Sequence, residues 1–326
     1  MENENIYQSR LDLSDLNKSV EEIKKELRKI IVGQEKMIES IIVAILANGH
    51  VLLEGVPGIA KTLTAKLMAK TISVAFSRIQ FTPDLMPSDI LGTSVFNMKS
   101  SEFEFKAGPV FSNIVLIDEI NRSPAKTQSA LFEVMEERQI SIDGNTYKMD
   151  TPFIVLATQN PIDLEGTYRL PEAQLDRFLF KINVSYPTAE QEALILQEAH
   201  ERKEKTELSE IKSILTKKKI ESYQKIIKSI HIEKKLIDYV AQLIVQTRNN
   251  SALFLGGSPR ASLAILNSAK VLAAIRGRDF VTPDDIKEVA LPVLRHRVIL
   301  TPEKEMEGMT ADGVITSIMD KIEVPR

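Results

Sequence analysis

A short glycine-containing stretch ahead of a Lys-Thr pair could bind phosphate. Residues 55–62 read G-V-P-G-I-A-K-T, follow an apolar run at 51–53 and open into a helix-like segment at 63–70. Strand, turn and helix in this order are typical of a phosphate-binding P-loop. Backbone N–H groups at the start of such a helix point at phosphate oxygens, and the helix dipole favours their negative charge. The stretch therefore predicts a nucleotide site.

The Lys-Thr pair supplies two side chains that such a loop uses. Lys61 would reach the β- and γ-phosphates, and the Thr62 hydroxyl would bind Mg²⁺. Ala60 departs from the pattern G-x-x-x-x-G-K-[ST], which has glycine there, so an ordinary strand-to-helix turn is the alternative reading of this stretch alone. The predicted nucleotide-binding residues here are Gly55, Val56, Pro57, Gly58, Ile59, Ala60, Lys61, Thr62 and Leu63.

Carboxylates follow a second apolar run. The run at 114–117 is not alternating, which is typical of a strand buried on both faces of a parallel sheet, and it ends in Asp118 and Glu119. Asp118 would hold Mg²⁺, and Glu119 would orient and deprotonate the attacking water. The alternative is an acidic pair facing solvent. Asn160 ends the next buried run, where its amide could hold the water or the γ-phosphate, or form a turn before Pro161.

A parallel sheet would bring these residues together. Strands are expected at 51–53, 74–81, 114–117, 153–157 and 178–184, and helices at 14–30, 34–47, 63–70, 123–138 and 171–177. Their alternation predicts an α/β fold with a parallel, helix-covered sheet. Aromatic and turn residues indicate two hairpins, one near 92–110 and one near 139–149.

The composition changes at residues 186–188. Helical periods follow at 189–205, 208–215, 220–229, 234–249, 260–275 and 283–290, without a convincing strand. With 326 residues the chain can form two cores. We expect an α/β nucleotide-binding domain at 1–187 and a smaller all-α lid domain at 188–326.

Composition excludes several classes of protein. A net charge of −3 argues against whole-surface binding of nucleic acid. Without cysteines there are no disulfides or thiolate metal sites, and the histidines lack metal-ligand spacing. The acidic, polar start is unlike a signal peptide, and no apolar run reaches the ~18 residues of a membrane helix. We expect a cytoplasmic protein without membrane insertion.

The chain resembles the AAA+ ATPases, and specifically the MoxR family. Matching stretches span nearly the whole chain in order: 31–34, 54–62, 78–84, 118–122, 157–161, 165–168, 170–178, 257–260 and 294–297. MoxR proteins are similar to the minichromosome-maintenance helicases in having alanine at the position of Ala60. That departure is then a family trait.

The resemblance implies further roles. Asn160 resembles the sensor-1 residue, Arg260 the sensor-2 arginine of the lid, and Arg177 the arginine finger that reaches the neighbouring subunit's nucleotide. The adenine-side segment would be Ile31, Val32 and Gly33. The hairpins correspond to the helix-2 insert and the pre-sensor-1 hairpin, which would line a pore or contact a client.

Several of these assignments stay open. The residues alone do not separate Arg177 from Arg122, Arg169 or Arg260 as the finger, nor decide whether Arg260 acts on its own or a neighbour's nucleotide. The segment 295–297, Arg-His-Arg, is either an interface patch or an exposed helix end.

The resemblance implies an ATPase that uses ATP and Mg²⁺. It would form a homo-oligomeric ring, hexameric in the family, and remodel, assemble or activate protein clients, including proteins with von Willebrand factor A domains. Two alternatives differ in class. One is a nucleic-acid motor related to the helicases, and the other is a nucleotide-gated binding switch with little turnover.

Overall fold

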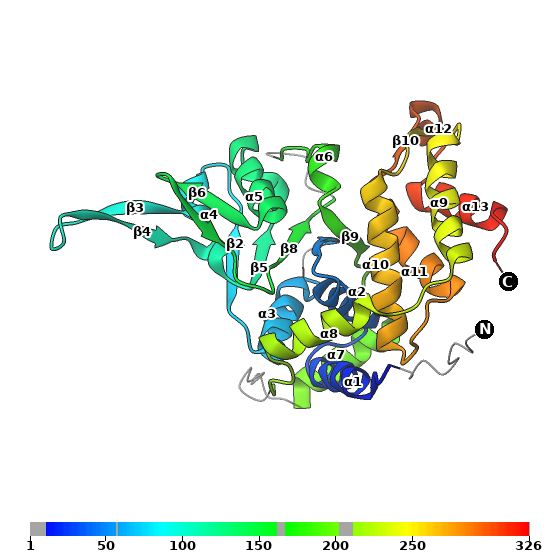
Figure 1. The fold of residues 1–326 in the computed structure, drawn as a ribbon, viewed down its shortest axis with the longest axis horizontal. Helices are drawn as coiled ribbons and strands as arrows, with labels where there is room; N and C mark the ends of the chain where they lie inside the picture. The colour runs from blue at the N-terminus through cyan, green and yellow to red at the C-terminus, as the bar shows by residue number, and fades with distance from the viewer. Residues whose placement is uncertain (1–10, 57, 162–166, 202–210, 326) are drawn as a thin grey trace, which may run out of the picture.

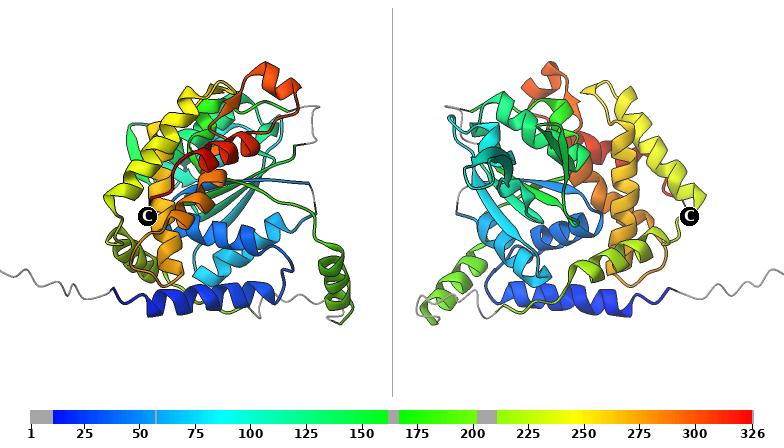
Figure 2. Two further views of the ribbon diagram at one scale, coloured as in Figure 1. Left: turned by 90° about the vertical axis from the view of Figure 1, so that its right-hand side faces the viewer. Right: turned by 60° about the vertical axis from the view of Figure 1, so that its left-hand side comes forward.

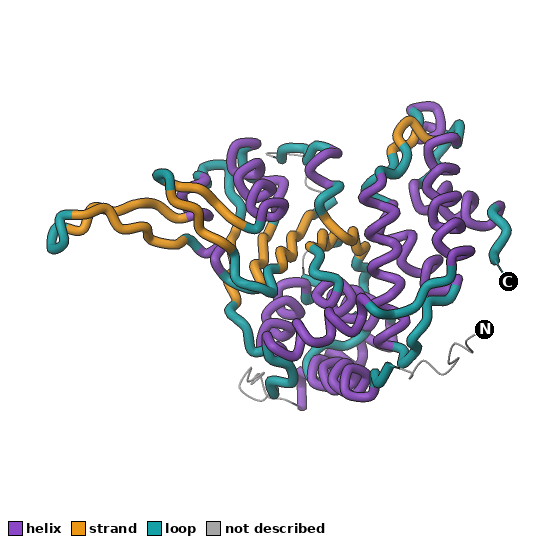
Figure 3. The backbone as a smooth tube through the Cα atoms, viewed as in Figure 1, coloured by secondary structure: helices purple, strands orange, loops and turns teal. Residues whose placement is uncertain are grey.

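The computed structural model describes residues 11–56, 58–161, 167–201 and 211–325. Among them, five parallel strands form the central sheet, in the order β2–β5–β8–β1–β9 (Figures 1 and 3). Their bounds are β1 (His50–Glu54), β2 (Phe76–Gln80), β5 (Ile114–Asp118), β8 (Ile154–Gln159) and β9 (Phe178–Asn183). Because β1, β5 and β8 are parallel neighbours, the segments that follow them meet at one edge of the sheet.

Helices cover both faces of this sheet. Successive side chains of a strand point to opposite faces, and accordingly Val51 and Leu53 pack in one core cluster while Leu52 packs in the other. The first cluster includes α1 (Ser14–Arg28), α2 (Glu35–Leu46) and α3 (Lys61–Ile72), and the second includes α4 (Pro87–Leu91) and α5 (Ala125–Glu137). The predicted parallel, helix-covered sheet is confirmed.

Both predicted hairpins are present. The pair β3 (Gly92–Asn97) and β4 (Glu102–Ala107) projects from the body at one end of the molecule (Figures 1 and 3). The shorter pair β6 (Gln139–Ile142) and β7 (Asn145–Lys148) lies beside its base. Phe105 of β4 stacks on Tyr147 of β7 with ring centroids 4.3 Å apart, so the two hairpins support one another. Short 3₁₀ turns, η1 (Pro109–Phe111) and η2 (Ile120–Arg122), flank β5.

The lid lies at the end opposite the β3–β4 hairpin (Figure 1). Its helices are α9 (Lys234–Asn249), α10 (Pro259–Ile275), α11 (Pro283–Leu294), α12 (Pro302–Met306) and α13 (Ala311–Lys321). The lid is helical as predicted, with one addition: β10 (Leu253–Leu255) and β11 (Ile299–Leu300) form a short antiparallel pair. The expected helix at 208–215 is wrong for 211–215, which are not helical, and 208–210 lie outside the described residues.

The segment between sheet and lid contacts α1 and α3 of the α/β layer through Ile214, Leu215 and Tyr223. It contains α7 (Ala189–Glu201) and α8 (Lys217–Lys228), while α6 (Glu172–Leu175) precedes β9 (Figure 2). Ile214 and Leu215 donate backbone hydrogen bonds to the Thr71 carbonyl of α3, and Tyr223 of α8 donates to Asp15 of α1 at 2.7 Å. A domain boundary at 187/188 stays a prediction. No helix within the described residues is long and apolar enough to cross a bilayer.

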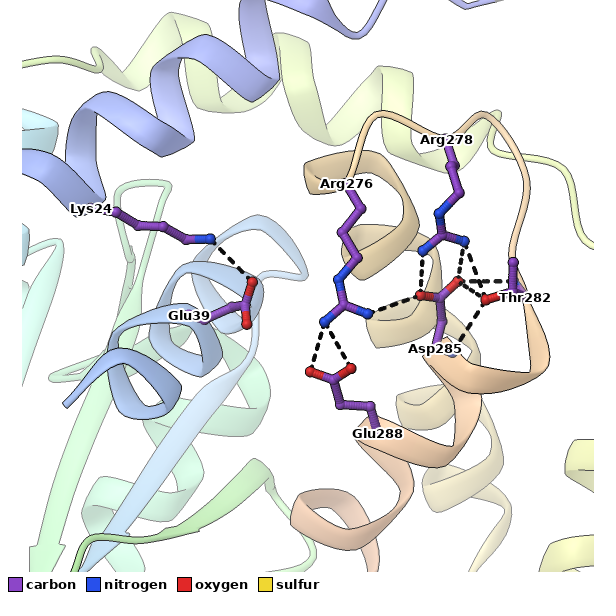
Figure 4. Close-up of polar contacts among 7 residues, drawn as sticks. All are labelled: Lys24, Glu39, Arg276, Arg278, Thr282, Asp285 and Glu288. Atoms are coloured by element: carbon purple, nitrogen blue, oxygen red, sulfur yellow. Dashed lines mark hydrogen bonds and ion pairs between the residues drawn. The ribbon is translucent and has the colours of Figure 1, made fainter. Parts of the chain in front are cut away.

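A buried carboxylate joins two lid helices. Asp285, whose side chain is fully buried, accepts hydrogen bonds of 2.7 Å from Arg278 and caps α11 through Thr282 (Figure 4). Arg276 lies 3.5 Å from the same carboxylate and pairs with Glu288. Burial alone would raise the pKa of Asp285, but the hydrogen bonds from Arg278 and Thr282 outweigh burial and hold that pKa below its ordinary value.

Replacing Asp285 with asparagine should lower the free energy of unfolding by about 3 kcal/mol, because the guanidinium groups lose their buried counter-charge. The depressed pKa means that this stability is present above the unfolded-state pKa, about 3.9, and is lost as pH falls through the folded-state value. Urea unfolding of both proteins at pH 7 and below pH 4 measures the difference. Glu288→Gln, at the exposed partner of Arg276, is the matched control and should cost under about 1 kcal/mol. Equal losses for the two variants would contradict this account.

Candidate active site

The loop between β1 and α3 has the backbone that a phosphate cradle requires. Gly58 is left-handed, with φ +86°, and a Cβ there would meet no atom within 4 Å. Ala60 is also left-handed, with φ 61° and ψ 17°, and α3 begins at the next residue, Lys61. At Gly55 a Cβ would lie 2.6 Å from the Val184 carbonyl oxygen, so only glycine fits. Pro57 of the predicted site lies outside the described residues.

A cavity of about 270 Å³ joins this loop to the ends of β5 and β8. It is lined by the predicted side chains Lys61, Thr62, Asp118, Glu119 and Asn160. The structure therefore brings the P-loop pair, the acidic pair and the amide together, as the parallel strand order requires.

Lys61 lies half-buried in this cavity. Its Nζ donates a hydrogen bond to the Gly55 carbonyl, which bends the side chain back over the loop. Burial lowers the pKa of Lys61, while the nearby carboxylates of Asp118 and Glu119 oppose that shift. An anionic phosphate in the cavity would stabilise the same ammonium group.

Asp118 is almost fully buried at the end of β5. Its Oδ1 lies 3.5 Å from the Thr62 hydroxyl and accepts from the Thr158 hydroxyl at 3.3 Å, and its Oδ2 accepts from Arg78 Nε at 2.6 Å. No cluster of three or more His, Cys, Asp or Glu that could hold a metal occurs in the described part of the chain. Mg²⁺ in nucleotide sites takes one or two protein oxygens and completes its shell with phosphates and water. The Thr62 and Asp118 oxygens fit that pattern.

Glu119 stands beside Asp118 in a left-handed backbone conformation, with φ 57°. The Thr158 hydroxyl holds this conformation by accepting from the Glu119 N–H at 3.0 Å. Glu119 Oε2 accepts from Gln80 Nε2 at 2.7 Å and lies 3.2 Å from Arg122 Nε. A strained backbone that aims a carboxylate into a cavity is characteristic of active sites.

Arg78 and Gln80 also line the cavity, although no sequence motif indicated a role for them. They lie two apart on β2, so both side chains point to the same side of the strand. Because β2 pairs with β5, Arg78 reaches Asp118 and Gln80 reaches Glu119. The sequence signal that could have identified them is their alternation with the apolar Ile79 in the strand that precedes the acidic pair.

The predicted adenine-side segment lies next to this loop. Gly33, with φ +76°, packs so closely on Gln191 of α7 that a Cβ would lie 2.4 Å from Gln191 Cδ. Gln34 donates to the Ser185 carbonyl at 3.3 Å, and Ser185 follows the Val184 that touches Gly55. The side chains of Ile31, Val32, Val56, Ile59 and Leu63 are buried or half-buried. These residues could meet a nucleotide chiefly through backbone groups, and Gln191 packs against the segment at Gly33.

Arg177 and Arg260 do not line the cavity. They meet instead on Glu136 near the end of α5, where Arg260 donates to Oε1 at 2.5 Å and Arg177 Nε lies 3.6 Å from Oε2. Both arginines thus lie on Glu136, outside the cavity that Lys61 lines.

The Arg-His-Arg segment is not an exposed helix end. His296 and Arg297 are buried, and both donate to main-chain oxygens of β9, as Arg295 does to Lys181. Both readings given above, interface patch and exposed helix end, are wrong for these two residues, which are buried within the chain. The segment attaches the lid to the sheet.

Replacing Ala60 with glycine should stabilise the protein. An L-residue in the left-handed region costs about 1–2 kcal/mol, whereas the extra freedom of an unfolded glycine costs about 0.5–1 kcal/mol. We expect a gain of up to about 1 kcal/mol in chemical unfolding, with ATP binding retained. Ala65→Gly, in the helical part of α3, is the control and should be destabilising. If Ala60→Gly lowered the free energy of unfolding as much as Ala65→Gly does, the left-handed backbone at Ala60 would hold no strain.

Comparison with known proteins agrees with this geometry. Residues 50–180 match the family described as "ATPase family associated with various cellular activities (AAA)", and residues 245–318 match the AAA lid domain. The chain is 46% identical to Chaperone MoxR1 of Mycobacterium tuberculosis over 92% of this chain and 81% of that protein. It is 43% identical to YeaC of Bacillus subtilis, an uncharacterized protein, over 95% of each chain. A crystal structure from Cytophaga hutchinsonii superposes with a TM-score of 0.89 at 42% identity, covering 96% and 97% of the two chains.

Proposed function

Because the chain belongs to the MoxR family of AAA+ ATPases, we propose that it hydrolyses ATP to ADP and phosphate and thereby remodels, assembles or activates protein clients. This proposal is carried by the observation that one cavity is lined by all of the predicted side chains Lys61, Thr62, Asp118, Glu119 and Asn160. These side chains can bind a triphosphate, neutralise its negative charge and position a water molecule for attack on it.

Each residue has a role that its position supports. The backbone N–H groups at 58–63 and the Lys61 ammonium would bind the phosphates, and Thr62 and Asp118 would hold Mg²⁺. Mg²⁺ supplies charge neutralisation at the phosphate oxygens when bound. Glu119 takes the proton of the attacking water, and Asn160 orients that water or the γ-phosphate.

We further propose that Arg177 and Arg260 both act on the neighbouring subunit's nucleotide. Their common contact with Glu136, away from their own cavity, supports an arrangement in which one surface presents both arginines. A guanidinium stabilises the charge that develops on the phosphoryl oxygens. A closed ring, hexameric as in the family resemblance, would complete every site in this way.

We propose that the β3–β4 hairpin contacts the client protein. Its tip exposes Phe96, Met98 and Phe103, which are 49%, 87% and 73% exposed. Apolar side chains held out on a projecting hairpin suit a protein surface, including that of a von Willebrand factor A domain. We also propose that the protein acts in the cytoplasm and that nucleic acid is not its substrate.

The test measures ATP turnover and mass together. Purified protein should hydrolyse ATP in the presence of Mg²⁺, and native mass spectrometry should show ATP-favoured rings. Lys61→Ala should lack turnover. Tight ATP binding without turnover would indicate the switch instead, and turnover stimulated by DNA and suppressed by salt would indicate a nucleic-acid motor. A monomer with and without ATP would rule out the ring.

A further inference from the structure

Arg297 uses its whole guanidinium to attach the lid to the segment that contains Arg177. The side chain is only 4% exposed. It donates to Asp176 Oδ1 at 2.6 Å, to the Asp176 and Phe178 carbonyls at 2.9 and 2.6 Å, and to the Leu179 and Val293 carbonyls. These five hydrogen bonds account for all five N–H groups of the guanidinium.

Two of these hydrogen bonds are made to the residues immediately before and after Arg177. The carbonyls of Asp176 and Phe178, the residues on either side of Arg177, both accept from Nη2 of Arg297. His296 lies 3.0 Å from the Phe178 carbonyl as well. The main chain that presents Arg177 is therefore bound directly to the segment after α11.

A second lid helix reaches the same place. Ser258, the N-cap residue of α10, donates to both carboxylate oxygens of Asp176 at 3.3 and 3.2 Å. Arg260 lies two residues after Ser258, and both Arg260 and Arg177 form ion pairs with Glu136. Asp176, the residue before Arg177, thus contacts both the start of α10 and the segment after α11.

We propose that Arg297 is a positioning residue for hydrolysis in the neighbouring subunit: it fixes the main chain around Arg177 to its own lid. This inference rests on the proposed function, in which Arg177 acts on the neighbour's nucleotide. Arg177 and Arg260 then keep fixed places relative to one another, so that the next site receives both arginines in a defined geometry.

The chemistry requires an arginine at this position. A planar guanidinium can hold a carboxylate and several carbonyls at fixed angles, whereas a lysine ammonium has three donors at one point. Lysine at 297 would keep the charge opposite Asp176 and lose the contacts on both sides of Arg177. A displacement of about 1 Å in a catalytic group can lower the rate by about 10²-fold.

The first measurement separates turnover from nucleotide binding. Arg297→Lys should lower kcat by about 10²-fold while the dissociation constant for ATP stays that of the wild type. Arg276→Lys, a lid arginine that pairs with Asp285 and Glu288, is the matched control and should keep wild-type turnover. Asp176→Asn, which keeps the side-chain shape, should lower kcat less and in the same direction. Circular dichroism and native mass spectrometry verify that each variant folds and forms rings.

Mixed rings distinguish positioning from a general lid defect. Arg297→Lys subunits have an intact P-loop and a misplaced Arg177, so mixing them with Lys61→Ala subunits should restore turnover at the shared interfaces. Mixing them with Arg177→Ala subunits should restore none, because both partners lack a working finger. The reverse pattern would mean that Arg297 serves its own nucleotide site and would overturn the inference.

The same experiment shows separately whether the proposed function fails. If Arg177→Ala and Lys61→Ala subunits form mixed rings without any turnover, the action of Arg177 on a neighbour is wrong. If that pair regains turnover but Arg297→Lys with Lys61→Ala does not, only the positioning role is wrong. Wild-type kcat in Arg297→Lys would likewise overturn it.

Discussion

Replacing Glu119 with glutamine should strongly lower ATP turnover and leave ATP binding intact. The amide has the size of the carboxylate and keeps an oxygen that can accept from Gln80, but it cannot take a proton from water. General bases contribute about 10²–10⁴-fold, so kcat should fall by a factor of that order. Single-turnover hydrolysis measures the loss, and calorimetric titration with ATP checks the binding.

Glu133→Gln is the matched control for this prediction. Glu133 is exposed on α5 and does not line the cavity, so its amide variant should turn over ATP like the wild type. Wild-type turnover in Glu119→Gln would remove Glu119 as the base. Because this variant would bind ATP without hydrolysing it, it is also the form with which to capture a bound client.

The sheet could be predicted because its strands are buried on both faces. The run 114–117 has no polar residue, and every residue of β5 is buried. The strands β10 and β11 could not be predicted, because segments of three and two residues are too short to show a period. Their pairing depends on the lid bringing distant segments together.

The cavity residues could be predicted because each follows a strand or begins a helix. Lys61, Asp118 and Asn160 stand at such ends, and parallel strands place their ends together. Arg78 was not predicted, because its role depends on β2 lying next to β5. Arg297 was misread because arginines are rarely buried. Its burial is favourable here because the Asp176 carboxylate and carbonyls at the start of β9 accept from its guanidinium.

Replacing Arg177 with alanine should lower ATP turnover by about 10³–10⁵-fold, the contribution of an arginine finger. Nucleotide binding should be unchanged, because Arg177 lies on Glu136 and not in its own subunit's cavity. Mixing Arg177→Ala with Lys61→Ala subunits should restore part of the activity, since some interfaces then combine an intact P-loop with an intact finger. Steady-state turnover over a range of mixing ratios, with native mass spectrometry of the rings, measures this rescue.

Arg169→Ala is the control that separates this role from the other arginines nearby. Arg169 is 85% exposed and pairs with Glu172, so its removal should leave turnover unchanged. Rescue that appears with Arg169→Ala and not with Arg177→Ala would transfer the finger to Arg169. If Arg177→Ala alone lost ATP binding together with turnover, the residue would serve its own nucleotide. Loss of turnover with normal binding and rescue in mixed rings requires that the arginine cross the subunit interface.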